Sequence, residues 1–357
     1  MGLLPDGART LRPSETDNLV RWSPKTADSG HVESFFVKWN ITDETKTNGD
    51  LPHRAFWLKF TIFQPAENRA PVLGEVWGIG FDPTNQDHIA VKESFGQEQW
   101  LLENDICYLR FGDSELRHGG SSGAISNGKH TIRWGIEWTT RTHGVRQLPF
   151  QWMYTKPFPK NKLTTPQPDG KVSGFIEIDG HRLDFDKAPG MQGHNWGTNH
   201  APVWVWAHSN ILEGNGRAVI EGVSSRVKLG PLRSGWLTIV YLEYDGEPIL
   251  LNSPAQLVRN RSQLDGLSWT FEVGNKEHRI VGRFEGEPDW FVGVNYHNPD
   301  GSLIHCLNTK MASGQIEYYR KGGGSGFQLV DTLVSNRGAA LEIGTRDNTE
   351  SIPIRIL

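Results

Sequence analysis

Residues 190–210, GMQGHNWGTNHAPVWVWAHSN, place three histidines and three tryptophans in one short segment. Its second half, VWVWAHS, is rich in β-branched and aromatic residues and predicts a β-strand. Because side chains alternate between the two faces of a strand, one face carries Trp204, Trp206, His208 and Asn210. Two indoles, an imidazole and an amide on one face can line a pocket for an apolar ligand that must also be oriented or protonated.

The chemistry that fits such a pocket is addition of water to an alkene, or ring closure across it. Both reactions begin with protonation, so the site needs a proton donor in an apolar cavity, aromatic faces that stabilise a carbocation, and exclusion of stray nucleophiles. The candidate proton donors are His194, Glu221 and His208. The candidate substrate-binding residues are Trp196, Trp204, Trp206, Asn210, Trp236, Tyr241 and Trp290.

Several of these residues also have a structural interpretation. Glu221 lies in the apolar run AVIEGV, where burial would raise its pKa. Alternation does not say which face is buried, so Glu221 can equally be an exposed glutamate of an edge strand. His194 lies in a glycine-rich stretch and can be a proton donor or a histidine that bonds a turn carbonyl. Trp196 can be a plug between two domains.

Metal binding and nucleophilic catalysis find little support. His194, His200 and His208 are spaced by six and eight residues, which does not match the helical or short-loop pairs that usually hold zinc, and no nearby acid completes a ligand set. No G-x-S-x-G elbow is present, and neither Cys107 nor Cys306 lies in an activating context. We therefore expect no metal site and no covalent nucleophile.

Composition limits the class of protein. The chain has 357 residues, enough for two domains, and its 40 glycines and 14 tryptophans favour a turn-rich all-β protein. The net charge of −4 gives no electrostatic footprint for nucleic acid or an anionic membrane. No apolar run approaches the roughly 20 residues that span a bilayer, and the N-terminus lacks the features of a secretory signal. We expect a cytoplasmic protein whose partner is an apolar small molecule.

Strand-like runs of five to nine residues, separated by turn residues, recur along the chain, which is typical of a sandwich or barrel. Residues 31–41 and 55–63 predict an antiparallel pair of strands, the first of them half-buried. Residues 129–140 alternate between apolar and polar side chains and predict one dry and one wet face. Asp179 and Gly180 predict the turn of a hairpin.

These patterns divide the chain into an N-terminal arm and two β-barrel-like domains packed side by side. The arm covers residues 1–30, where the sequence is polar and predicts a loose structure. The first domain covers residues 31–189 and the second residues 190–357, although no sequence repeat relates them. Residues 148–169 are rich in proline, lysine and glutamine and predict a long loop or lid.

The sequence Gly193-His194-Asn195-Trp196-Gly197 resembles the HNWG signature of the hydroxyneurosporene synthase (carotenoid hydratase), AttH-like and tocopherol-cyclase-like group, which also includes lipocalin-type Diels–Alderases. The hairpin before the motif and the strand WVWAHSN after it resemble the same group. Its members typically show Asp-His-x-Trp-Gly at the junction of two lipocalin-like domains. Gly193 replaces that aspartate here, so this chain has no carboxylate at that position of the motif.

The resemblance implies two lipocalin-like β-barrels, a hydrophobic cavity, no metal or redox cofactor, and hydration, proton-initiated cyclisation or pericyclic cyclisation of polyenes or isoprenoids. Only His194 and Trp196 carry over from the motif. We therefore expect a cofactor-independent cyclase, hydratase or isomerase that acts on a polyene, terpenoid or polyketide intermediate by acid catalysis or by holding a folded shape. The alternative is a carrier without catalysis. A sugar-binding sandwich is a third reading, but glycoside hydrolysis needs two facing carboxylates and only Glu221 is a candidate.

Overall fold

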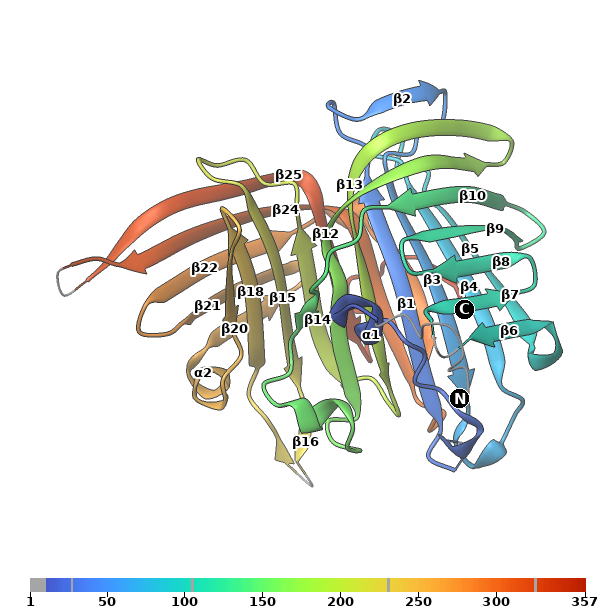
Figure 1. Cartoon of the computed structure of the whole chain (residues 1–357), viewed down its shortest axis with the longest axis horizontal. Coiled ribbons are helices and arrows are strands. Elements are labelled where there is room, and N and C mark those ends of the chain that lie inside the picture. The colour runs from blue at the N-terminus through green and yellow to red at the C-terminus, as the bar shows by residue number, and fades with distance from the viewer. Residues whose placement is uncertain (1–10, 27, 104–105, 230–231, 324–325) are drawn as a thin grey trace, which may run out of the picture.

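A computed structural model of the chain describes residues 11–26, 28–103, 106–229, 232–323 and 326–357. These residues form two large β-sheets that lie side by side, the first coloured blue to yellow-green and the second olive to red (Figure 1). Helices are short, namely α1 (Pro13–Asp17), α2 (Pro254–Arg259) and the 3₁₀ turns η1 (Pro24–Thr26), η2 (Ala66–Asn68), η3 (Gln97–Gln99), η4 (Gln151–Tyr154) and η5 (Pro288–Trp290). The expectation of an all-β protein with two barrel-like halves is confirmed.

The first sheet contains 13 strands within the described residues. Its neighbours in order are β5 (Ile89–Gly96), β4 (Leu73–Phe81), β3 (Ala55–Gln64), β1 (His31–Asn40), β13 (His181–Gly197), β12 (Asn161–Ile178), β10 (Thr131–Trp138), β9 (Gly120–Ser126), β8 (Ser114–Arg117), β7 (Tyr108–Phe111) and β6 (Trp100–Glu103). The short strands β2 (Lys46–Gly49) and β11 (Val145–Arg146) pair with β13 and β12. The predicted antiparallel pair is β1 and β3, and the predicted hairpin is β12 and β13.

The second sheet contains 11 strands within the described residues. Its neighbours in order are β19 (Glu247–Leu251), β18 (Leu237–Tyr244), β15 (Ala218–Arg226), β14 (Val203–Ser209), β25 (Phe327–Thr345), β24 (Leu303–Lys321), β22 (His278–Glu285), β21 (Ser268–Gly274) and β20 (Arg261–Asp265). β23 (Val292–His297) completes this sheet with β26 (Ile354–Ile356), since β23 pairs with β24 and with β26. β16 (Lys228–Leu229) and β17 (Leu232–Arg233) form a separate two-stranded sheet.

The two sheets follow the same path. In the first half, β1 is followed on one side by β3, β4 and β5, and it pairs on its other side with β13. In the second half, β14 is followed on one side by β15, β18 and β19, and it pairs on its other side with β25. β13 and β25 are each the second strand of a long hairpin. The hairpins β12–β13 and β24–β25 then continue to β10, β9, β8 and to β22, β21, β20. The chain is therefore duplicated in topology, although the sequence shows no repeat. It passes from the first sheet to the second at residues 198–202, so residues 190–197 pair in the first sheet.

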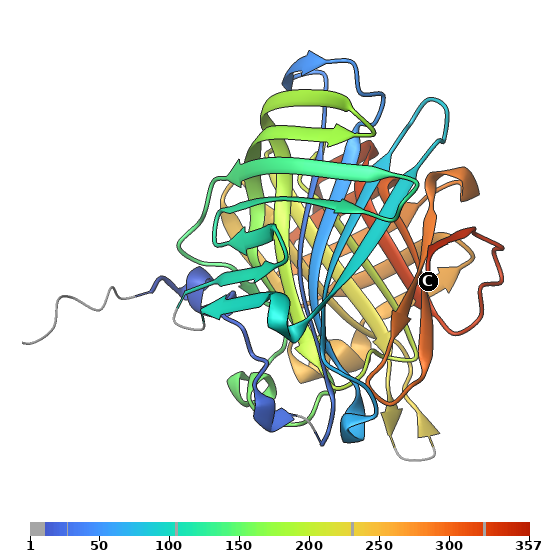
Figure 2. The same ribbon diagram turned by 90° about the vertical axis from the view of Figure 1, so that its right-hand side faces the viewer.

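The described part of the chain forms three hydrophobic cores. One fills the first half, one fills the second, and a third contains side chains of both halves, among them Phe36, Trp57, Trp206 and Tyr296. When the molecule is turned, the first sheet lies in front of the second, and the C-terminal strand returns toward β5 at the front (Figure 2). The third core is thus the seam between the two sheets.

This seam corrects one expectation. β1 was expected to be half-buried, but all of its side chains are buried. Phe35, Val37 and Trp39 face the first core, whereas Phe36 on the opposite face belongs to the third core. The second face is dry because the second sheet covers it. β10, in contrast, alternates between buried and more exposed side chains as predicted, because water lies on its outer face.

The arm and the lid also differ from expectation. Residues 1–10 lie outside the described residues, but α1 follows directly, and Val20 and Trp22 join the first core, so the described part of the arm is ordered. The predicted lid ends at residue 160, because β12 begins at Asn161. Pro166 and Pro168 fit this strand because the pairing shifts register on either side of Gln167.

Among the described residues, no helix is both long and apolar enough to cross a membrane.

Candidate active site

A cavity of about 460 Å³ lies at the seam between the two sheets. Its volume falls in the range of small-molecule sites. The first sheet contributes side chains of β1, β3, β12 and β13 to the walls, and the second sheet contributes side chains of β14, β15, β18, β23 and β25. The segment 147–160 before β12, α2, the connection 199–202 between the sheets and residues 298–302 also contribute. Both halves are therefore required to form it.

The register of the strands aligns the cavity walls as two rows of side chains. Cross-strand pairing places Gly193, Phe36, Lys59 and Trp77 in one row across β13, β1, β3 and β4. The equivalent strands of the second sheet carry Glu342, Trp206, Val223 and Ile239. All members of the second row, with Phe36 and Lys59 of the first, line the cavity.

Trp204 and Trp206 supply the aromatic wall of the second sheet, as predicted for their strand face. Gly344 pairs with Trp204 across the two strands, and a Cβ at position 344 would lie 2.0 Å from the indole nitrogen. The indole ring therefore fits only because residue 344 has no side chain. The ring of Phe36 meets Trp206 edge-on with centroids 5.6 Å apart. Trp57 adds a third indole from the first sheet.

Lys59 brings a cation to this apolar cavity. Its side chain is only 4% exposed, and its Nζ lies 3.7 Å from the centroid of the Tyr296 ring and 4.8 Å from that of Trp77. Lys59 Nζ donates no hydrogen bond within the described residues. Burial lowers the pKa of Lys59 to about 8, and the carboxylates of Glu342 and Glu75 limit this shift. The ammonium is therefore a comparatively acidic proton donor that faces the cavity.

A second polar group lies beside it. Glu342 accepts a hydrogen bond from Lys310 Nζ at 2.7 Å, and the Cys306 thiol lies 3.8 Å from the same carboxylate. Burial raises the pKa of Tyr296 and of Cys306 well above their ordinary values, so both remain neutral. Tyr296 and Cys306 therefore hold their protons more firmly than usual, whereas Lys59 holds its proton less firmly.

Glu221 is buried, but it stands behind the cavity wall. Its carboxylate accepts hydrogen bonds from Trp206 Nε1 at 2.8 Å, Thr165 Oγ1 at 2.8 Å and Gln147 Nε2 at 3.0 Å. Burial raises its pKa, and these three donors oppose the shift. Of the four, only Trp206 and Gln147 line the cavity. Glu221 therefore orients two side chains of the cavity lining, Trp206 and Gln147, and does not itself face the cavity.

His194 is fully buried away from the cavity. Its Nδ1 lies 2.7 Å from the carbonyl oxygen of Asp17 and therefore donates, while Nε2 lies 2.9 Å from Glu33 Oε1. Its ring stacks on Phe35 with centroids 4.1 Å apart. These contacts bind the N-terminal arm to the HNWG stretch. A hydrogen bond to a backbone carbonyl is also the structural alternative that the sequence analysis gives for His194.

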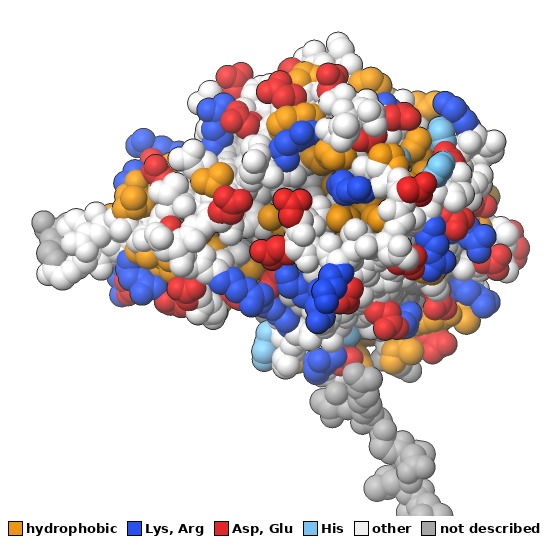
Figure 3. All heavy atoms as spheres, turned by 90° about the horizontal axis from the view of Figure 1, so that it is seen from above, with side chains coloured by type: hydrophobic (Ala, Val, Ile, Leu, Met, Phe, Trp, Pro, Cys, Tyr) orange, Lys and Arg blue, Asp and Glu red, His pale blue; other side chains and the backbone are white. Residues whose placement is uncertain are grey.

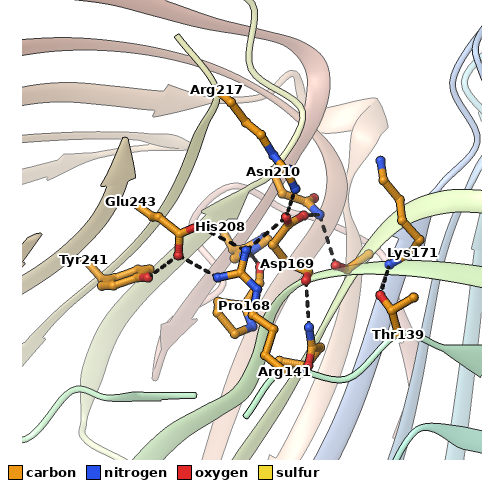
Figure 4. A network of polar contacts seen from close by, with 12 residues as sticks. Thr139, Arg141, Pro168, Asp169, Lys171, His208, Asn210, Arg217, Tyr241 and Glu243 are labelled. Atoms are coloured by element: carbon orange, nitrogen blue, oxygen red, sulfur yellow. Dashed lines mark hydrogen bonds and ion pairs between the residues drawn. The ribbon is translucent and has the colours of Figure 1, made fainter. Parts of the chain in front are cut away.

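His208, Asn210 and Tyr241 belong to a polar network at the seam rather than to the cavity lining (Figure 4). His208 Nε2 donates to the carbonyl of Pro168 at 2.7 Å, and burial lowers the pKa of His208 well below its ordinary value, so the ring is neutral. Asn210 Nδ2 donates to Asp169 at 3.0 Å, and Tyr241 donates to Glu243 at 2.8 Å. A neutral His208 in this position is not a proton donor toward the cavity.

The remaining predicted tryptophans also lie outside the cavity lining. Trp196 contacts His194 and the ring of Tyr154, so it supports the segment that covers the cavity. Trp236 and Trp290 pack against the second core beneath arginine side chains. The described residues contain no group of three or more potential ligands that could hold a metal ion.

Gly193 has a specific partner. A Cβ at this position would lie 2.2 Å from the Phe36 ring, which occupies the space beside it. We expect Gly193→Ala to push the ring into the cavity and to lower the stability of the protein by about 1–3 kcal/mol, the usual cost of overpacking. Thermal unfolding and ligand affinity measure both effects. In a Phe36→Ala background, where the ring is gone, Gly193→Ala should lower the stability by much less than in the wild type, and an equal loss in both backgrounds would contradict this explanation.

Comparison with known proteins agrees with this architecture. An AttH-like protein of Nitrosomonas europaea has a solved structure that superposes over 97% of this chain and 99% of its own, with a TM-score of 0.52 and 12% identity, which shows the shared fold. The tocopherol cyclase of Zea mays is 29% identical over 248 residues, and an uncharacterized protein of Mycobacterium tuberculosis is 32% identical over 139 residues.

These alignments cover 64% and 38% of this chain but only 49% and 40% of the maize and mycobacterial proteins, so the chain spans less than half the length of these relatives. A sequence model of the tocopherol cyclase-like family matches residues 162–345, just over half of the chain. The matched region begins in β12 and runs to the end of β25, so it contains the HNWG stretch, Trp204, Trp206 and Glu342. The chain belongs to the tocopherol cyclase-like family.

Proposed function

We propose that this protein is a cofactor-independent cyclase or hydratase that acts on an apolar polyene or isoprenoid held in the cavity between its two sheets. The observation that carries the proposal is the position of Lys59, a buried ammonium without a hydrogen-bond partner among the described residues, at the end of an aromatic cavity. The names of the maize relative and of the family, both tocopherol cyclase, support ring closure as the type of reaction.

The proposed reaction begins when Lys59 Nζ transfers a proton to an alkene carbon of the ligand. The indole faces of Trp57, Trp204 and Trp206 stabilise the carbocation, since an aromatic face attracts positive charge. A hydroxyl group of the ligand, or a water molecule, then forms the new C–O bond and loses its proton. That proton returns to the neutral amine of Lys59, so the cycle consumes no other reagent. This assignment replaces His194, His208 and Glu221 as proposed donors.

Mass spectrometry in D₂O tests the proposal. The protein is incubated with a panel of polyenes and isoprenoid alcohols, and the products are compared with those formed in H₂O. Acid-initiated cyclisation places one deuterium on carbon, and hydration adds one water molecule as well. A product without carbon-bound deuterium indicates catalysis by shape alone, and an unchanged bound ligand indicates the carrier.

The aromatic wall permits a separate prediction about binding. Trp204→Ala should weaken the binding of geranylgeraniol by about 30-fold, because the contact between a ligand and the half-buried indole contributes about 2 kcal/mol. Quenching of tryptophan fluorescence on titration measures this affinity. Trp236→Ala is the matched control, because its indole packs against the second core outside the cavity lining. Equal losses for the two variants would contradict the assignment of the cavity as the binding site.

A further inference from the structure

The segment that closes one end of the cavity has two unlike faces. Residues 147–160 lie at the lower edge of the molecule in Figure 1, between the two sheets. On the inner side Leu148, Pro149 and Met153 line the cavity. Gln147 anchors the segment to Glu221, and the backbone N–H of Leu148 donates to the Tyr154 hydroxyl at 2.8 Å. The inner face is therefore fixed.

The outer face of the same segment exposes large aromatic side chains. Phe150, Trp152 and Phe158 are 44%, 48% and 51% exposed, and the first two rings stack with centroids 6.1 Å apart. Phe158 also lines the cavity, so it stands in the opening. α2 lies on the same rim, where Leu257 lines the cavity and Val258 is 84% exposed. Such clustering at the mouth of an apolar cavity is uncommon for a surface that meets only water.

The charges around these rings are basic. Lys156, Lys160 and Arg259 are exposed, and none of them forms an ion pair within the described residues. Residues 147–163 contain no aspartate or glutamate. Two acids line the cavity: Asp300 already accepts hydrogen bonds from Asn199 and Ser302, and Glu342 already accepts one from Lys310. The opposite end of the molecule differs, since acidic and basic side chains are interspersed there (Figure 3).

We propose that segment 147–160 and α2 form a surface that docks on an anionic lipid bilayer, so that an apolar ligand passes directly from the membrane into the cavity. Aromatic side chains suit the interface between lipid and water, and nearby cations are attracted to anionic headgroups. The net negative charge of the whole chain does not oppose this, because salt screens distant charges within about 10 Å. Docking does not depend on the proposed catalysis.

Cosedimentation with vesicles tests the proposal. The wild-type protein should bind vesicles of phosphatidylcholine mixed with phosphatidylglycerol more tightly than phosphatidylcholine alone, and added salt should weaken this binding. Phe150→Ser with Trp152→Ser should lower the affinity by at least about tenfold. Lys156→Glu with Arg259→Glu should lower it by more than about 30-fold, since each cation near an anionic surface contributes roughly fivefold. None of these four residues lines the cavity.

The tip of the β24–β25 hairpin provides the matched control, because Phe327 and Leu329 are also exposed apolar residues. Phe327→Ser with Leu329→Ser should leave vesicle binding unchanged. A wild-type protein that stays in solution with both vesicle types, or a control variant that loses as much affinity as the aromatic variant, would overturn the proposal. Turnover of a detergent-solubilised ligand is measured in parallel, so that loss of docking is distinguished from failure of the proposed catalysis.

Discussion

Lys59→Met is expected to abolish turnover while leaving the protein at least as stable as the wild type. A general acid contributes about 10²–10⁴-fold to a rate, so kcat should fall by at least about 100-fold. Stability should not suffer, because a buried ammonium without a hydrogen-bond partner opposes folding and methionine fills a similar volume. Product formation followed by mass spectrometry, together with thermal unfolding, measures the two effects. A fully active Lys59→Met protein would instead support catalysis by shape.

Lys92 is the matched control for this experiment. Its Nζ lies 4.9 Å from the ring of Trp77, the same indole that Lys59 contacts at 4.8 Å, but it pairs with Glu75 at 3.6 Å and does not line the cavity. Lys92→Met should therefore retain wild-type turnover. Lys59→Arg tests the acid itself, because a guanidinium keeps the charge and does not release its proton near neutral pH. It should be as inactive as Lys59→Met.

The same assignment fixes the pH dependence of kcat. Burial lowers the pKa of Lys59 to about 8, and the ammonium is the form that donates. The rate should be constant below this pH and fall as the pH rises above about 8, by about tenfold per unit. A rate that instead rises with pH through this range would mean that the neutral amine is the active form, and the lysine would then be a base.

The sequence was sufficient to predict where strands occur, but not whether each face of a strand meets water or another part of the protein. The alternation in β1 and β3 correctly separates Phe36 and Lys38 from Phe35 and Val37. Periodicity reports the chemistry of each face and not what covers it, so β1 was predicted to be half-buried although both of its faces are covered. The missed signal is a lysine two residues after an aromatic residue and therefore on the same face, as in Phe36-x-Lys38 and Trp57-x-Lys59, which indicates a cation placed against a second apolar surface.

The candidate site was predicted in part for the same reason. Trp204, Trp206, His208 and Asn210 do share a strand face, but the cavity ends after Trp206 and the two polar residues continue into the seam network. No local pattern shows where a cavity ends. The lid was predicted too long because prolines in a strand are read as loop, whereas register shifts on either side of Gln167 accommodate them in β12.

Glu33→Gln should be among the most destabilising single substitutions in the first half. The buried carboxylate of Glu33 contacts four donors, the backbone N–H groups of Arg21 and Trp22 and the rings of His31 and His194, at 2.7 to 3.0 Å. Glutamine replaces one acceptor oxygen with an amide that faces donors, so unfolding should become easier by about 3 kcal/mol. Glu137→Gln is the control, since its ion pair with Arg117 is exposed and contributes about 1 kcal/mol or less.

The pH dependence of the free energy of unfolding shows whether Glu33 stabilises the protein through its charge or only through its packing. Burial alone would raise the pKa of Glu33, but hydrogen bonds from His194 and His31 outweigh it and lower the pKa to about 2 from an ordinary 4.5. A depressed carboxyl pKa stabilises the folded state above pH 4.5, and this contribution is lost as the pH falls toward 2. The difference in unfolding free energy between wild type and Glu33→Gln should therefore shrink across this interval. A difference that stays constant would mean that packing, rather than charge, holds the arm on the HNWG stretch.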